Sequence, residues 1–351
     1  MSRPLFVVAL AALSTASAAA ACVGSDPVPV GAGPGAADAA TSETGSGADG
    51  ATPDGGGGGG DAQVDAGARC DPSKPFGIVE RLDGISTAND ESGVWVSADE
   101  LTAYVATAPL GSSATTIMKS TRASRDVAFS APATAPELVN VNANVLSVSS
   151  PSFTADGLVM AMVRDAAGQP TDGVFVSIRA STNDVFPVPT FARSRASNIN
   201  ALGDAFLVPG GESLFMARVS ATKYDLEEAP RDVKMIYGDG GFVDYAVAPN
   251  VVNVNATNAD DRHPVVSKDL LTLVFASNRA PGAGENTDLY LSTRAGPAGV
   301  FTAPVRLSEP ISSDAADSPG TLSDDGCALY FTSKRAGGFG GWDVYVAHRP
   351  Q

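Results

Sequence analysis

The residues of this chain that are best suited to chemistry are grouped around His263. In the segment NADDRHP, residues 258 to 264, this histidine follows Asp260 and Asp261. An imidazole beside carboxylates can hold a metal ion or transfer protons. One histidine with two nearly adjacent acids is a weak signal, because such residues also shape turns. The second histidine, His348, lies within a predicted strand just before Arg349, and we interpret it as structural.

The motifs of several common enzyme classes are absent from the sequence. It contains no G-x-S-x-G, H-E-x-x-H or C-x-x-C, so serine hydrolases, zinc proteases and thioredoxin-like enzymes lack their residues here. The run GGFGG at 337 to 341 could resemble a phosphate loop, but a predicted strand follows it rather than a helix. We therefore predict no catalytic residue, no metal and no cofactor. A glycosidase, whose chemistry needs only two carboxylates, is the remaining enzyme alternative.

Two residue patterns recur at a period of about 56 residues and indicate the elements that position these side chains. The first is a serine or threonine two residues before an aspartate, with spacings of 57, 113 and 56 residues between Asp99, Asp156, Asp269 and Asp325. A spacing of 113 is two periods, and Gly210 and Gly211 fall where the missing copy should be. The second is an arginine seven residues before a phenylalanine, at 122/129, 179/186 and 294/301.

Each repeat contains four short candidate strands with turn signals between them and no long helical pattern. The last repeat has GTLS (320 to 323), the hairpin signal Asp325-Gly326, ALYFTS (328 to 333), a glycine loop and DVYVAHR (343 to 349). Such recurring strands are typical of an all-β propeller. Five units are marked by Phe76, Phe129, Phe186, Phe242 and Phe301. We predict a five-bladed β-propeller over residues 70 to 351, with six blades as the alternative.

The last repeat supplies three strands and then the chain stops, whereas FGIVERL (76 to 82) is a fourth strand with nothing before it to pair with. Pairing the two would close the ring and remove an exposed edge. The chain has three cysteines. If Cys22 carries a lipid, Cys70 and Cys327 remain and can form a disulfide at the two ends of the folded region. The alternative is two free thiols.

The amino-terminal part of the chain has the features of an export signal and a tether. Residues 1 to 22 contain a short apolar run followed by small residues, as in a secretory signal. Cys22 follows three alanines and resembles a lipobox cysteine, although ordinary cleavage and secretion is the alternative. Residues 23 to 69 are rich in Gly, Ala and Asp, and we expect a disordered linker. We expect a lipid-anchored protein of the cell envelope, in the outer rather than the inner membrane.

The net charge of the chain is −16. This charge disfavours nucleic acid and anionic lipid as partners, so we expect contact with a membrane only through the lipid. We expect a monomer that binds a protein or a glycan.

The segments that enter the first strand of each predicted unit are rich in Asn, Asp and Ser. In a propeller these segments lie on one face, so we predict a polar and acidic surface suited to a cation, a sugar or a basic peptide. The alternative is that these residues only shape turns. The candidate ligand-face residues are Asn89, Asp90, Asn142, Asn200, Asp260, Asp261, His263, Asp314 and Asp317.

The last two repeats resemble the WD-like repeats of TolB-type bacterial propellers. The similar stretches are SDDG…LYFTSKRAGGFGGWDVY (323 to 345) and SKDLLTLVFASNRAPGAGENTDLY (267 to 290). The resemblance implies a propeller outside the cytoplasm that serves as a binding platform, and it implies no activity. TolB itself is described with six blades and an added domain, whereas five units and a linker are counted here, so its specific role does not carry over.

Overall fold

The structure is a computed structural model, and it describes residues 69–166, 173–193, 202–220, 223–230, 251–279 and 286–351. All of them belong to one compact unit, residues 64–351. The signal segment, Cys22, nearly all of the linker, Asn200 and Phe242 lie outside the described residues. Arg69, at the end of the predicted linker, is described.

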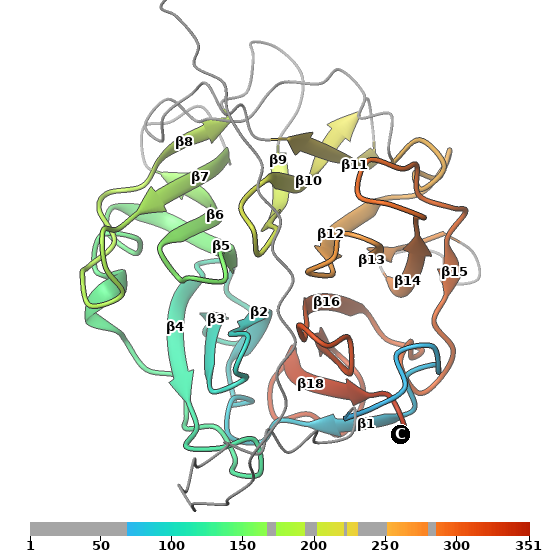
Figure 1. Ribbon diagram of the computed structural model, residues 1–351. Coiled ribbons are helices and arrows are strands. Elements are labelled where there is room, and N and C mark those ends of the chain that lie inside the picture. Colours follow the sequence, from blue (N-terminus) through green and yellow to red (C-terminus); the bar gives the residue numbers. More distant parts are fainter. Residues whose placement is uncertain (1–68, 167–172, 194–201, 221–222, 231–250, 280–285) are drawn as a thin grey trace, which may run out of the picture. The chain divides into compact units, whose positions relative to one another are not determined.

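The described residues form five antiparallel sheets, with one short 3-10 helix, η1 (Pro136–Leu138), between two of them (Figure 1). The first two sheets contain β2 (Asp90–Val96), β3 (Thr102–Ala108), β4 (Thr116–Thr121), and then β5 (Val145–Phe153), β6 (Val159–Ala166), β7 (Gly173–Ile178) and β8 (Thr190–Arg193). The third contains β9 (Leu202–Leu207), β10 (Ser213–Ser220) and β11 (Lys223–Pro230).

The last two sheets have four strands each. One contains β12 (Asp261–Val266), β13 (Thr272–Ser277), β14 (Asp288–Thr293) and β15 (Val305–Arg306). The other contains β16 (Asp317–Leu322), β17 (Ala328–Ser333), β18 (Asp343–His348) and, from the start of the folded region, β1 (Ile78–Arg81).

The first strands of the five sheets contact one another in a closed circuit. β2 contacts β5, β5 contacts β9, β9 contacts β12, β12 contacts β16, and β16 contacts β2 again. Each sheet therefore packs face to face on two neighbours, and its second strand is covered on both sides. Strand β17 is buried at every position, and β3 and β13 at every position but the first. This is the β-propeller fold that the repeats predict.

The Ser-x-Asp pattern is explained by the hairpin between the first and second strand. In the first repeat the Asp99 carboxylate accepts hydrogen bonds from Ser97 Oγ (2.5 Å) and from the Leu101 backbone N–H (2.9 Å). The same pair of bonds recurs at Asp156, Asp269 and Asp325. These aspartates shape turns, as Asx motifs do.

The arginine–phenylalanine pattern is a stacked pair that ties the end of the third strand to the connection after it. The guanidinium carbon lies 4.4 Å from the ring centre in Arg122–Phe129 and 4.3 Å in Arg179–Phe186. Each arginine Nε also donates to the carbonyl at the left-handed turn of its own hairpin, as Arg179 does to Gly157 at 3.0 Å. The recurring phenylalanine, which the repeat suggests as the start of the fourth strand, lies before that strand instead. Its ring is buried under the arginine, and β8 and β15 begin four residues later.

The last repeat uses the same pair across the two ends of the folded chain. Arg349 stacks at 4.1 Å on Phe76, and its Nε donates to the Gly326 carbonyl at 2.9 Å. Directly after Phe76, β1 pairs antiparallel with β18, with Ile78 opposite His348. The predicted disulfide between Cys70 and Cys327 is present, with a Cα–Cα distance of 5.6 Å. The predicted closure of the fold by its amino-terminal strand is therefore observed.

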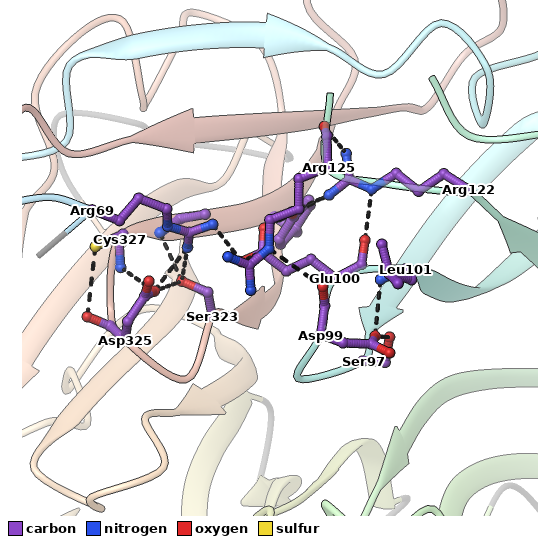
Figure 2. A network of polar contacts seen from close by, with 12 residues as sticks. Arg69, Ser97, Asp99, Glu100, Leu101, Arg122, Arg125, Ser323, Asp325 and Cys327 are labelled. Carbon is purple, nitrogen blue, oxygen red and sulfur yellow. Dashed lines mark hydrogen bonds and ion pairs between the residues drawn. The ribbon is translucent and has the colours of Figure 1, made fainter. Parts of the chain in front are cut away.

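A buried carboxylate adds a polar link at the same closure (Figure 2). Glu100 occupies the left-handed turn position of the first repeat, with φ +62°, where glycine stands in three other repeats. It accepts hydrogen bonds from Arg69 Nη1 (2.5 Å) and Tyr330 Oη (2.6 Å). Arg69 also donates to Asp325 (2.8 Å), which lies beside the disulfide. Glu100 thus joins the first repeat, the last repeat and the chain entry.

Among the described residues, no helix is both long and apolar enough to span a membrane.

Candidate functional site

Every first strand carries a β-bulge, and in all five strands a bulge lies three to five residues before the turn that follows. At each of these bulges, one or two residues of the first strand have no paired residue on the second strand. These residues are Ser92, Ser150–Pro151, Asp204, His263–Pro264 and Gly320. Three of them have left-handed backbones: Ser150 at φ +51°, Asp204 at +53° and His263 at +50°. A bulge turns a side chain out of the regular alternation of a strand.

These bulges surround one cavity, which we call the axial cavity because residues of all five first strands line it. Its volume is about 280 Å³. Serine and threonine hydroxyls dominate the polar part of the lining, from Ser92, Ser113, Thr115, Ser147, Ser149, Ser150 and Ser318. Gly320 lies where a Cβ would stand 2.4 Å from the Val94 carbonyl oxygen of the neighbouring sheet. Only glycine fits this close approach.

Below the cavity, aromatic side chains fill the space between the first strands. Trp95 and Phe153 lie with ring centres 4.6 Å apart, and together with Phe206 they line only a small void of about 20 Å³. The axial cavity is thus a polar recess above an apolar floor.

The charged groups of the cavity form one connected set. Arg262 donates from Nε to Asp204 Oδ2 at 2.8 Å and from Nη2 to Oδ1 at 3.4 Å. Nδ1 of His263 lies 2.9 Å from the same Oδ1. The Arg262 guanidinium also stacks on the Tyr224 ring at 4.2 Å. Asp204 therefore holds both basic side chains in place.

The pKa values of this set show that the ion pair is strong. Burial by itself would raise the pKa of Asp204, but the nearby Arg262 and His263 outweigh burial and hold the pKa far below its usual range. The Asp204 carboxylate in turn raises the pKa of Arg262, against the effect of burial. Asp204 is ionised at any physiological pH, so it cannot donate a proton to a substrate.

Of the predicted ligand-face residues that the structure describes, only His263 lines the axial cavity. Asp261 and Asp317 are buried and pair with Arg279 (2.5 Å) and Arg335 (2.9 Å), so both serve the fold. The carboxylate of Asp90 accepts from the N–H groups of Gly111 and Trp342, each at 3.0 Å.

The remaining ligand-face residues lie at strand edges or in loops. Asn142 bonds both backbone groups of Ile117 in β4, at 3.1 and 2.9 Å. Asp260 accepts from the Tyr224 N–H at 2.8 Å. Asn89 and Asp314 are exposed. Asn142 and Asp260 thus tie the segments before β5 and β12 to the backbone of the preceding sheet.

Sequence reasoning placed His263 with the wrong acids. Its carboxylate partner is Asp204, in the preceding repeat, rather than the adjacent Asp260 or Asp261. Asp204 and Arg262 were not singled out, since neither belongs to a motif. A bulge leaves no recognisable pattern in a single sequence. The one local signal for the bulge at His263 was Pro264, because proline is disfavoured inside a regular strand pair.

Among the described residues, no group of three or more His, Cys, Asp and Glu side chains is placed to hold a metal ion.

A second cavity, of about 420 Å³, lies at the closure near Arg69, Glu100 and Arg122. Its buried charges are paired with one another, so we assign it to the stability of the fold.

No protein-family model matches the chain, and no curated protein matches it. Solved structures that are similar include a putative TolB from Agrobacterium tumefaciens, at 10% identity and a TM-score of 0.43, covering 78% of this chain and 97% of that one. The catalytic domain of a GH62 α-L-arabinofuranosidase from Coprinopsis cinerea is 9% identical, with a TM-score of 0.46 and coverages of 79% and 97%.

A putative glycoside hydrolase from Bacteroides ovatus is 12% identical, with a TM-score of 0.46 and coverages of 77% and 96%. TolB-type proteins and glycoside hydrolases therefore both occur among the similar structures. At these identities and TM-scores the similarity assigns neither a family nor an activity.

Proposed function

We propose that this protein is a membrane-tethered, extracytoplasmic β-propeller of TolB-like type that binds a glycan or a protein through its axial cavity and catalyses no reaction. The observation that carries the proposal is the composition of the cavity. It combines many hydroxyl groups with a single carboxylate, and that carboxylate is bound to Arg262 and His263. Such a lining offers hydrogen bonds to a ligand and no free acid.

The same observation argues against glycoside hydrolysis, the enzyme alternative. That chemistry uses two carboxyl groups, about 5 to 10 Å apart, one of which acts as acid in its protonated form. Asp204 is the only acidic residue of the described cavity lining, and its lowered pKa keeps it ionised. A binding role requires neither a second carboxyl group nor a proton donor.

The test is binding to a glycan array and turnover of a panel of chromogenic glycosides, with the wild type and two matched variants. Ser92→Trp fills the cavity, whereas Ser124→Trp adds the same side chain at an exposed position outside it. We expect Ser92→Trp to abolish glycan or protein binding, Ser124→Trp to retain it, and no glycoside to be cleaved. Turnover that Asp204→Asn abolishes would establish the hydrolase instead.

The tether is part of this proposal. The lipobox-like Cys22 and the Gly-rich linker after it would hold the propeller at the surface of a membrane, with the outer membrane preferred. Ordinary signal cleavage, giving a secreted or periplasmic protein, is the alternative. We propose a monomer, because the circuit of sheets is closed within one chain.

A further inference from the structure

We infer that the axial cavity recognises a carboxylate-bearing sugar, of the uronic-acid class, through Arg262 and His263. This inference rests on the proposed function and specifies its ligand. It is carried by the polar atoms of these two residues that the protein leaves unused, by the charge of the cavity and by its size.

Arg262 and His263 each keep one nitrogen for a ligand. Arg262 bonds Asp204 through Nε and Nη2, while Nη1 has no partner among the described residues. His263 contacts Asp204 through Nδ1 and its own backbone N–H, which leaves Nε2 without a described partner. Their side chains are 35% and 31% exposed, and both line the cavity. The free nitrogens are therefore accessible to a bound group.

At the cavity the positively charged group is more exposed than the negatively charged one, which favours an anion. Asp204 neutralises one positive charge and is only 7% exposed, so it presents little negative surface. Arg262 and His263 have side chains that are 35% and 31% exposed, so the polar groups that reach the cavity surface are the nitrogens rather than the carboxylate. A guanidinium donates charge-assisted hydrogen bonds to a carboxylate. The protein as a whole carries a charge of −16, so this polarity is a local feature.

The pair is held rigidly before any ligand arrives. Asp204 and His263 both lie in bulges with left-handed backbones, and Asp204 fixes the two basic side chains from behind. Tyr224 supports the guanidinium plane at 4.2 Å. Because these contacts exist within the protein, a ligand would not have to order the two side chains on binding. Asp204 acts here as a positioning residue.

The other residues that line the axial cavity suit a sugar ring better than the carboxyl terminus of a protein. Hydroxyl groups can both donate to and accept from sugar hydroxyls, and the lining contains six serines besides Thr115, whose hydroxyl donates to the Val148 carbonyl. Trp342, half-buried, adds an aromatic surface at the cavity. A volume of about 280 Å³ is just below the roughly 300 to 1,000 Å³ of drug-sized ligand pockets, which suits one sugar unit.

The experiment is calorimetric titration of the protein with three kinds of probe: galacturonate and glucuronate oligosaccharides, the matching neutral galactose and glucose oligosaccharides, and unblocked peptides that offer only a carboxyl terminus. We expect the uronates to bind at least tenfold more tightly than the neutral sugars. Their affinity should fall as salt rises, since the contact is ionic.

The variants separate this contact from general effects of charge. Arg262→Gln should weaken uronate binding on the order of 10- to 100-fold, as expected for a charge-assisted hydrogen bond. Lys268→Gln removes the same charge at an exposed site outside the cavity and should change nothing. The double variant Asp204→Asn with Arg262→Gln removes both charges of the ion pair and leaves no buried carboxylate without its arginine, so it tests the site even if the single variant folds poorly.

Three results would overturn the inference. Equal affinity for uronates and neutral sugars, with Ser92→Trp still blocking both, would refute the acidic ligand and leave the proposed function intact. Tight binding of the peptides alone would replace the sugar with a chain terminus. Absence of cavity-dependent binding by sugars, peptides and proteins alike would refute the inference and the proposed function together.

Discussion

Glu91 is a buried acid whose repeat lacks the arginine that pairs with its counterparts. The equivalent Asp261 and Asp317 stand opposite Ser277 and Ser333, and the arginine two residues after each serine neutralises the acid. Glu91 stands opposite Thr107, and two residues later the chain has Pro109 instead of arginine.

The absence of an arginine at this position has two consequences for the surroundings of Glu91. The Thr107 hydroxyl is buried without a hydrogen-bond partner among the described residues. Burial, opposed by hydrogen bonds from Thr87 and assisted by the charges of Asp343 and Asp90, raises the pKa of Glu91 to about 7. The native state therefore holds a proton on Glu91 at a pH where the unfolded chain has released it.

This raised pKa predicts a pH dependence of stability. Its contribution is fully present below the unfolded-state pKa of 4.5 and is lost as pH rises through about 7. Glu91→Gln cannot ionise, and its side-chain oxygen can still accept from Thr87. We expect this variant to match the wild type at pH 4.5 and to be more stable at pH 8, by about 3 kcal/mol at most.

Urea unfolding of both proteins at the two pH values measures this difference. A variant that is no more stable than the wild type at pH 8 would show that the Glu91 carboxylate is stabilised by contacts beyond those described. The Glu100→Gln variant is not a suitable control, because Glu100 pairs with arginines at the closure.

Among the strands, the closure of the propeller at the last sheet is held by three kinds of contact. Strand β1 completes the last sheet, and the Arg349 guanidinium stacks on the Phe76 ring. The disulfide joins Cys70 and Cys327, which are 257 positions apart in the sequence. The ionic network of Glu100 and Arg69 lies beside them (Figure 2). Because β1 and β18 come from opposite ends of the folded chain, losing their contact would expose two strand edges.

Removal of the disulfide should therefore lower stability substantially. We expect Cys70→Ser combined with Cys327→Ser to unfold at lower denaturant, with a loss of about 2 to 5 kcal/mol. Guanidinium unfolding, read by tryptophan fluorescence, measures the loss, and the wild type treated with a reductant is the matched comparison. Equal stability of all three proteins would mean that β1 and the Glu100 network hold the closure without the covalent bond.

At the scale of the whole molecule, the proposed tether and the closed propeller have separate roles. In the proposed function, the tether would set where the protein resides and the propeller would set what it binds. The contact circuit of the five first strands runs within residues 90–322, which lie after the predicted linker. We therefore expect that loss of the lipid anchor would change the location of the protein but would leave its axial cavity unaffected.

Cys22→Ser tests this separation. If Cys22 is lipidated, the variant should move from the membrane fraction to the soluble fraction on cell fractionation, while binding by the purified propeller stays unchanged. A single lipid chain binds membranes only weakly, so the multiple acyl chains of a bacterial lipoprotein would be needed for stable anchoring. Wild-type protein found wholly in the soluble fraction would instead support ordinary signal cleavage.

The propeller class, the closing strand and the Cys70–Cys327 pair could all be predicted from the sequence. These features depend on local contacts that recur in the repeats. The Ser97–Asp99 hydrogen bond shapes the hairpin turn, and the Arg122–Phe129 stack follows the third strand, so both leave a pattern in the sequence. Cys70 and Cys327 could be paired since the period placed them at the same end of one sheet.

The position of the candidate site could not be predicted from the sequence, because its residues come together only when the sheets pack. Asp204 belongs to the repeat in which the aspartate marker is missing, and its partners Arg262 and His263 come from the next sheet. Two of the acids predicted for the ligand face, Asp261 and Asp317, pair with arginines of their own sheets. A bulge in each inner strand brings distant residues to one cavity, and such a shift depends on how neighbouring sheets pack, which no local pattern encodes.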